Sequence, residues 1–186
     1  MIFRKAALTE FDEVMQVIED GRTALANLGL DQWQNGSPSA EGIRANIEAG
    51  QTRVVVLDGK IVGTLAFIDT GEPDYANILE GQWLNVSPNS EQEAQRLNQP
   101  VSYAVLHRVA TAACATKQGV ATFMIQKSCE LARDKGLKSV RADTHRGNIP
   151  MQRTFEKCGM TRCCRVELSF ESHEATKERI GYEILL

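Results

Sequence analysis

The sequence predicts a single mixed α/β domain, spanning residues 1–186, in which a sheet carries helices on both of its faces. Segments with alternating apolar residues, typical of strands, are interspersed with segments whose apolar residues recur at helical spacing. Apolar residues make up 42% of the chain and charged residues 24%, which is the balance of a globular domain with one sizeable core.

The first third of the chain predicts a strand, two helices and a hairpin. Thr9 is expected to cap the first helix, because Glu10 and Asp12 follow it at positions that favour the first turn. The pair Asp58-Gly59 suits the tight turn of a hairpin. In chain order, these elements are expected at residues 2–8, 10–29, 40–50, 53–57 and 61–67.

Residues 70–100 have the weakest pattern, with three prolines and many acids. Connections of this length without structure usually serve binding, and a short strand is expected within it at residues 83–86. The remaining pattern is clearer. It predicts a strand at 101–111, a helix at 119–135, a strand at 137–142, a helix at 150–157 and a strand pair at 163–170 and 180–186.

Charge and composition argue against several classes of protein. The net charge is −3 and no basic tract is interleaved with aromatic residues, so we expect no nucleic-acid partner. No apolar run approaches the ~18 residues of a membrane span, and no signal-peptide core follows the first residue, so we expect a cytoplasmic protein. The five cysteines fit neither a disulfide framework nor a zinc site, which predicts reduced thiols and no metal.

The turn before the helix at 119–135 has the clearest chemical signal. Helices usually begin with a capping or acidic side chain, whereas this one begins with Thr116, Lys117, Gln118 and Gly119, and its first acid is Glu130. Free backbone N–H groups, the positive end of the helix dipole and a glycine that lets a ligand approach together predict a site for a diphosphate. The alternative is an ordinary turn whose glycine relieves strain.

These residues resemble the phosphate loop of the GNAT superfamily of N-acetyltransferases. The family pattern is Gln/Arg-x-x-Gly-x-Gly/Ala, and residues 119–121 match its last three places. Thr116 departs from the pattern at its first place, where Lys117 and Gln118 are the candidates to substitute for the missing side chain. The resemblance continues with a strand over 139–143, an asparagine at Asn148 and a short helix that ends at Gly159-Met160.

The resemblance implies a twisted, mostly antiparallel sheet of about seven strands, with its fourth and fifth strands splayed apart. It also implies that acetyl-coenzyme A is the cosubstrate, that no metal is needed, and that an amine of a small molecule or peptide attacks the thioester directly. A homodimer is compatible with this family. The coenzyme-binding residues that the resemblance implies are Val109, Thr111, Lys117, Gln118, Gly119, Val120, Ala121, Thr122 and Asn148.

The resemblance leaves the catalytic acid and base open. Some members carry a glutamate on the fourth strand, where this chain has Val105. His107 lies two residues further along the same predicted strand face, which also carries Val109, and histidine titrates in the useful range. Asp143 and His145, at the end of the next strand, are the rival bases.

The leaving thiolate also lacks its usual proton donor. Many members have a tyrosine in the last helix, and the matching position here is Phe155. The loss of both this tyrosine and the glutamate keeps a second reading open, in which a degenerate member binds coenzyme A or a small ligand without turnover. A third reading, a different phosphate-binding domain, is disfavoured because the P-loop and full dinucleotide motifs are absent.

Trp33 and Gln34 follow the first helix, where members of the family bind their acceptors. An exposed tryptophan there would wall the acceptor pocket, and the alternative is a loop anchor. Acids in the weakly patterned segment, Glu72, Asp74, Glu80 and Glu91, would favour a cationic amine if they line the site, or form a solvated surface if they do not.

Overall fold

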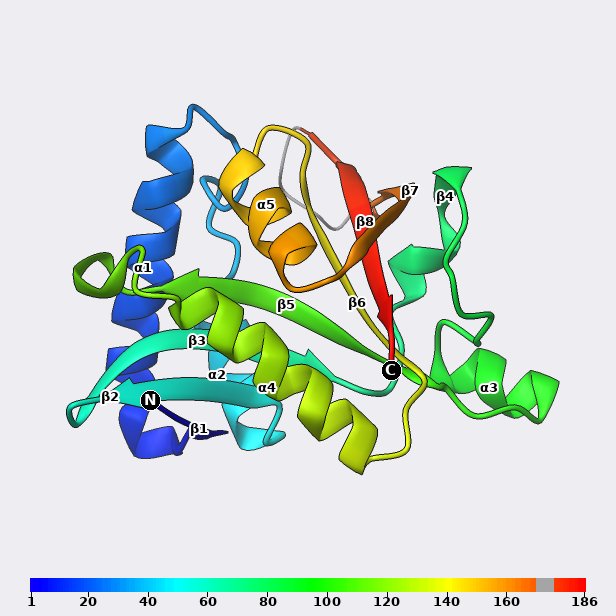
Figure 1. Cartoon of the computed structure of the whole chain (residues 1–186), viewed down its shortest axis with the longest axis horizontal. Helices are drawn as coiled ribbons and strands as arrows, with labels where there is room; N and C mark the ends of the chain where they lie inside the picture. Colours follow the sequence, from blue (N-terminus) through cyan, green and yellow to red (C-terminus); the bar gives the residue numbers. More distant parts are fainter. Residues whose placement is uncertain (170–175) are drawn as a thin grey trace.

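An eight-stranded sheet with helices on both faces forms the fold of residues 1–169 and 176–186, which this computed structural model describes (Figure 1). The strands are β1 (Ile2–Lys5), β2 (Thr52–Leu57), β3 (Lys60–Ile68), β4 (Ile78–Gly81), β5 (Tyr103–Thr111), β6 (Ser139–His145), β7 (Thr161–Glu167) and β8 (Glu178–Leu185). Their order is β1-β2-β3-β5-β6-β8-β7-β4, and only β5 and β6 pair in parallel. The predicted mixed, mostly antiparallel sheet is therefore confirmed.

Four of the five helices of the described residues cover the sheet in two groups, and α3 lies to the side (Figure 1). The helices are α1 (Phe11–Asn27), α2 (Ala40–Glu48), α3 (Glu91–Leu97), α4 (Val120–Asp134) and α5 (Ile149–Lys157). α4 and α5 lie on one face, and α1 and α2 lie on the other. The close approach of α4 to β3 depends on Gly63, since a Cβ there would lie 2.6 Å from Cγ1 of Val120. No helix of the described ranges is long and apolar enough to cross a membrane.

The first helix begins later than its sequence pattern predicts. Residues Leu8–Glu10 form a 3-10 turn and α1 begins at Phe11, so the prediction of Thr9 as the cap is wrong. Glu10 is the N-cap residue of α1 without a side-chain cap; its carboxylate instead accepts the N–H of Ala7, ahead of the 3-10 turn, at 2.8 Å and forms an ion pair with Arg4.

The segment between β3 and β5 contains structure that the sequence pattern does not reveal. β4 and α3 lie within it, whereas the strand expected at 83–86 is wrong. These residues do not pair in the sheet, because the backbone N–H groups of Leu84 and Asn85 donate to a carboxylate of β8; the Trp83 ring is buried in the core, where its Nε1 donates to the carbonyl of Tyr75 at 2.9 Å. Both β4 and α3 are short and without fully buried side chains, which explains their weak pattern. Phe170, the last residue of the strand expected at 163–170, lies outside the described residues.

A buried ion pair anchors this segment to the sheet. Arg141 on β6 and Glu183 on β8 are 1% and 0% exposed, and their Nε and Oε1 atoms are 3.0 Å apart. Oε2 of Glu183 also accepts the backbone N–H of Leu84 at 2.5 Å and that of Asn85 at 3.2 Å. The Arg141 guanidinium lies over the ring of Trp83, 4.6 Å from its centroid. The ion pair therefore fixes residues 83–85, which hold the preceding part of the segment against the cleft described below.

Candidate active site

A cleft opens where β5 and β6 separate. The two strands pair only from Tyr103 to Leu106 and from Ser139 to Ala142, and beyond these residues they diverge. The gap belongs to a cavity of about 900 Å³ whose walls come from α1, β5, the start of α4, the end of β6 and α5. In the family's numbering these are the fourth and fifth strands, because β4 is an additional edge strand. The splayed strands are thus where the resemblance places them.

The cleft has two chemically different ends, on opposite faces of the sheet. Gly63 of β3 faces α4, and alternation along β3 puts Ala66 on the other face. His107 pairs with Ala66, so its side chain lies on the face covered by α1. The gap between β5 and β6 connects the two ends, because residues of both line the same cavity.

The end at α4 presents backbone donors. Gly119 is the N-cap, with a φ of 80°, and no side chain caps the helix. The N–H groups of the first turn have no intrahelical acceptors, as at any helix start, and the residues that carry them line the cavity. A Cβ at Gly119 would meet no atom within 4 Å, so the space beside the turn is open. Lys117, Arg153 and Lys157 bring three cations to the same wall. This arrangement suits a diphosphate.

Asn148 connects this wall to α5. Its Oδ1 accepts the N–H of Met151 at 3.3 Å and caps the helix, while the side chain lines the cavity. Its amide nitrogen has no hydrogen-bond partner in the described part of the chain, and it therefore remains available as a donor to a ligand.

A bulge in β5 shapes the middle of the cleft. Ala66 pairs with His107 and Thr64 pairs with Ala110, so β5 has one residue more than β3 between these pairs. Arg108 takes up the extra length with a φ of 57°, a conformation that costs a side chain of this kind about 1–2 kcal/mol. The bulge reverses the alternation of the strand. Ala110, and not Val109 as predicted, therefore shares the face of His107.

A cluster of hydrogen-bonded side chains lies at the opposite end. Nε2 of His107 is 2.8 Å from Oε2 of Glu72, and Nδ1 is 3.9 Å from Oδ1 of Asp143. The Tyr75 hydroxyl donates to the same Asp143 oxygen at 2.8 Å. An ionised Glu72 can only accept, so Nε2 of His107 carries the proton and the lone pair of a neutral ring lies on Nδ1. Glu72 thus holds the imidazole in one tautomer, as the aspartate of a Ser-His-Asp triad does.

Electrostatics favour the charged form of Glu72 in this cluster. Burial raises the pKa of Glu72, but the hydrogen bond and charge of His107 and the N–H of Asp74 outweigh burial and lower the pKa below its usual value. The pKa of Tyr75 is raised well above its usual range, by burial first and by Asp143 second. Near neutral pH, Glu72 is therefore ionised and Tyr75 is a hydrogen-bond donor.

Most residues predicted for the site do line this cleft. His107 and Asp143 meet at one end, and Trp33 lies in the wall near them, with its ring against Gly21 of α1. Those of the predicted coenzyme residues that line the cavity are Val109, Thr111, Lys117, Gly119, Val120, Ala121, Thr122 and Asn148.

Three predicted residues do not line it. The Gln34 amide donates to the carbonyls of Arg22 and Gln32 and holds the loop after α1. Gln118 donates through its side chain to the carbonyl of Cys114 at 3.0 Å. His145 accepts the N–H of Gly147 on Nδ1 at 3.0 Å and is only 8% exposed, so it shapes the turn after β6. Burial is the main reason that the pKa of His145 is lowered.

The sequence patterns missed three residues of the site. Tyr75 lies in the weakly patterned segment, and Arg108 and Arg179 are strand residues whose neighbours only the fold reveals. Glu72 was foreseen only as one of several acids. Phe155 lines the cleft and packs on Tyr182 with ring centroids 5.2 Å apart, and no tyrosine lines the cleft in the described ranges.

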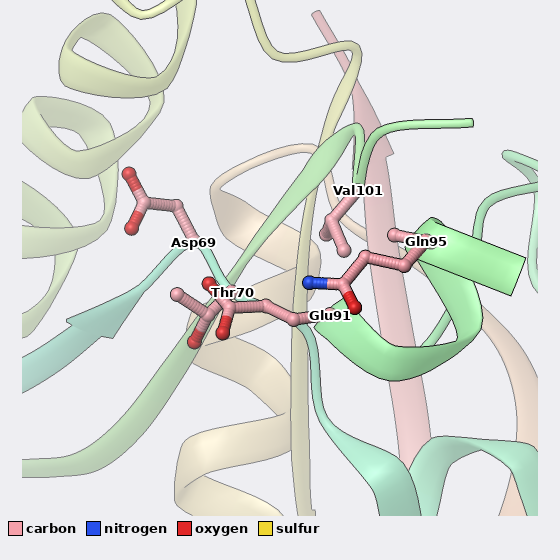
Figure 2. Close-up of a pocket in the computed structure, with 6 residues that line it drawn as sticks. Asp69, Thr70, Glu91, Gln95 and Val101 are labelled. Atoms are coloured by element: carbon pink, nitrogen blue, oxygen red, sulfur yellow. The ribbon is translucent and has the colours of Figure 1, made fainter. Parts of the chain in front are cut away.

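A smaller cavity of about 320 Å³ lies between the end of β3 and α3 (Figure 2). Figure 2 shows Asp69, Thr70 and Gln95 around it, with Glu91 and Val101. Asp69 is already paired with Lys135 at 2.8 Å. This cavity has neither the backbone donors nor the histidine of the cleft, and we place the functional site in the cleft.

Two of three comparisons relate this chain to known proteins. The model of the acetyltransferase (GNAT) family matches residues 22–160. A GNAT-family acetyltransferase from Streptococcus agalactiae 2603 has a similar structure, with 29% identity and a TM-score of 0.82 over 100% of this chain and 95% of that one. Comparison with curated protein sequences gives no match.

More distant solved structures share the fold. PaiA N-acetyltransferase from Thermoplasma acidophilum, solved in complex with coenzyme A, has 13% identity and a TM-score of 0.65 over 100% of this chain and 98% of that one. Ribosomal-protein-alanine N-acetyltransferase from Brucella melitensis has 14% identity and a TM-score of 0.66, with both chains fully covered. Because the family model covers well over half of the residues and the splayed cleft is in place, the chain belongs to the GNAT acetyltransferase family.

Proposed function

We propose that the protein, as a single catalytic domain over residues 1–186, transfers an acetyl group from acetyl-coenzyme A to an amine by direct attack in a ternary complex. The observation that carries this proposal is the single cleft that joins an uncapped helix N-terminus to the cluster of His107, Glu72 and Asp143. One end fits the diphosphate of the coenzyme, and the other can accept a proton from an amine.

The residues present fit the coenzyme. The N–H groups at the start of α4 and the cations Lys117, Arg153 and Lys157 would hold its phosphates, and the Asn148 amide offers a further donor. The edge of β5 beyond Leu106 pairs with no strand of the described residues on the β6 side, so it can pair with an extended pantetheine chain. The bound coenzyme supplies an activated acetyl thioester.

The other end prepares the nucleophile. Carboxylates of Glu72, Asp74 and Asp143 line it and favour an incoming ammonium group. Nδ1 of His107 can take the proton of that group, because Glu72 already occupies Nε2. A backbone N–H of the β5 bulge is the candidate donor to the oxyanion that forms as the amine attacks.

Among the described residues, no tyrosine lines the cleft to protonate the departing thiolate. A coenzyme A thiol has a pKa of about 8.5, so its thiolate is a fair leaving group without help. If its departure limits turnover, Phe155→Tyr should raise kcat near neutral pH, because the new hydroxyl would lie where the family carries its acid. A folded variant with an unchanged kcat would show that protonation at this position is not limiting. The melting temperature of the variant checks that the ring still packs on Tyr182.

The alternative function is binding of coenzyme A without turnover, which the missing tyrosine favours. Release of free thiol from acetyl-coenzyme A, measured against a panel of amines and confirmed by mass spectrometry of the acetylated product, separates the two. Amine-dependent release supports transfer. Binding of coenzyme A without release for any amine would support the alternative and overturn the proposal.

A further inference from the structure

The end of the cleft at His107, where the acceptor amine would bind (the acceptor end), holds a cation that has no ion-pair partner among the described residues. Arg108 lines the cavity on the face covered by α1 and α2, and its Nη1 atom is buried without a hydrogen-bond partner in the described part of the chain. No carboxylate of the described residues lies within 4.0 Å of its guanidinium, so it forms no ion pair. A buried donor left unpaired is costly, and it therefore points to a missing acceptor.

The nearest charges do not supply that acceptor. The charge of Glu72 attracts the Arg108 guanidinium from more than 4.0 Å away, but the two Glu72 oxygens already contact Nε2 of His107 and the N–H of Asp74. The guanidinium also lies beside the first turn of α2, since a Cβ at Gly42 would be 3.8 Å from Nη2. The positive end of that helix dipole repels a cation.

Arg179, which lines the same cavity beside Asp143, is in contrast an arginine whose guanidinium has partners. It is 1% exposed, its Nη1 donates to the carbonyls of Thr176 and Glu178, and its Nε is 3.8 Å from Asp143. Arg108, in contrast, is held at a bulge in a backbone conformation that favours glycine. Strain at such a position is a reason to look for a function of the side chain.

We infer that the amine acceptor also carries a carboxylate, which Arg108 binds, so that the substrate class is a free amino acid and not a simple amine or a peptide N-terminus. This inference rests on the proposed acetyl transfer. The planar guanidinium matches a carboxylate with two parallel hydrogen bonds. The carboxylates around His107 would receive the ammonium group, and Arg108 would receive the carboxylate. The acceptor end of the cleft would thus recognise both charges of one small molecule.

Matched pairs of acceptors test the inference. Thiol release from acetyl-coenzyme A is measured with each amino acid and with its own α-carboxamide, which keeps the amine and side chain but removes the negative charge. We expect the best acceptors to be amino acids, with kcat/KM about 10–100-fold above that of their carboxamides. Equal or better transfer to the carboxamides would overturn the inference and leave the proposed function intact. No transfer to any amine, with coenzyme A still bound, would overturn both.

Variants of Arg108 assign the preference to this residue. Arg108→Gln should raise KM for the amino acid about 10–100-fold and leave KM for the carboxamide unchanged. Arg44→Gln removes the same charge from an exposed position of α2 outside the cleft, and should change neither. Arg108→Gly should act like Arg108→Gln without lowering the melting temperature, because glycine relieves the strain. A preference for amino acids that survives both Arg108 variants would overturn the role of Arg108.

Discussion

His107→Gln should lower kcat by about 10²–10⁴-fold, the usual effect of removing a general base. Glutamine keeps much of the size of the ring and can still hydrogen-bond to Glu72, but it cannot take a proton. Coenzyme binding should not change, because the phosphates would lie on the opposite face of the sheet, at α4. Steady-state kinetics with the best acceptor amine and calorimetric titration of coenzyme A measure these two quantities.

Two companion variants separate a base from a merely structural histidine. His145→Gln should retain its kcat, because His145 is held in the turn after β6 and does not line the cleft. Glu72→Gln should lower kcat less than His107→Gln, since it leaves the base in place and removes only the carboxylate that holds Nε2 of His107. Full activity of His107→Gln would show that the amine loses its proton elsewhere, for example to Asp143 through water.

Arg141→Met should destabilise the protein by about 3–5 kcal/mol, because it leaves Glu183 buried and without its cation. For a chain of this size, the loss corresponds to a fall of roughly 10 °C in melting temperature. Acceptor binding should also weaken, since the Tyr103 hydroxyl accepts the N–H of Glu72 and the Tyr103 ring packs under the Arg141 guanidinium.

The double variant Arg141→Met, Glu183→Leu is the control for that prediction. Replacing both charges by apolar groups removes the unpaired carboxylate, so the double variant should be more stable than Arg141→Met alone. Denaturant unfolding of the wild-type protein, both single variants and the double variant gives the coupling energy directly. A double variant that is as unstable as the sum of the two single variants would show that the pair is not coupled.

The sheet and the coenzyme end of the cleft were predictable because their signals are local. The Asp58-Gly59 turn, the apolar face of α4 and the absence of a capping side chain before Gly119 each depend on neighbouring residues. The divergence of β5 and β6 was predicted only from the resemblance to a family, because no pattern within either strand encodes it.

The acceptor end could not be predicted because its residues meet only in the folded chain. Tyr75 and Asp143 are 68 positions apart in the sequence, and Glu72 reaches His107 across 35. The bulge at Arg108 defeats a simple alternation argument, since it moves Val109 away from the face of His107. Buried polar contacts of this kind have no periodicity, which is why the weakly patterned segment at residues 70–100 concealed two residues of the cluster.

The most direct test of the account is a calorimetric titration of coenzyme A into the wild-type protein and two matched variants. Gly119→Glu places a bulky negative charge at the uncapped start of α4, and Gly136→Glu places the same side chain just beyond its other end. Both glycines have a positive φ, 80° and 75°, and open space beside them, so the two substitutions carry similar backbone strain. We predict that coenzyme A binds the wild-type protein and Gly136→Glu with similar affinity and that binding to Gly119→Glu is lost. Unchanged binding to Gly119→Glu would contradict the assignment of the diphosphate to this helix, and with it the placement of the active site in the cleft.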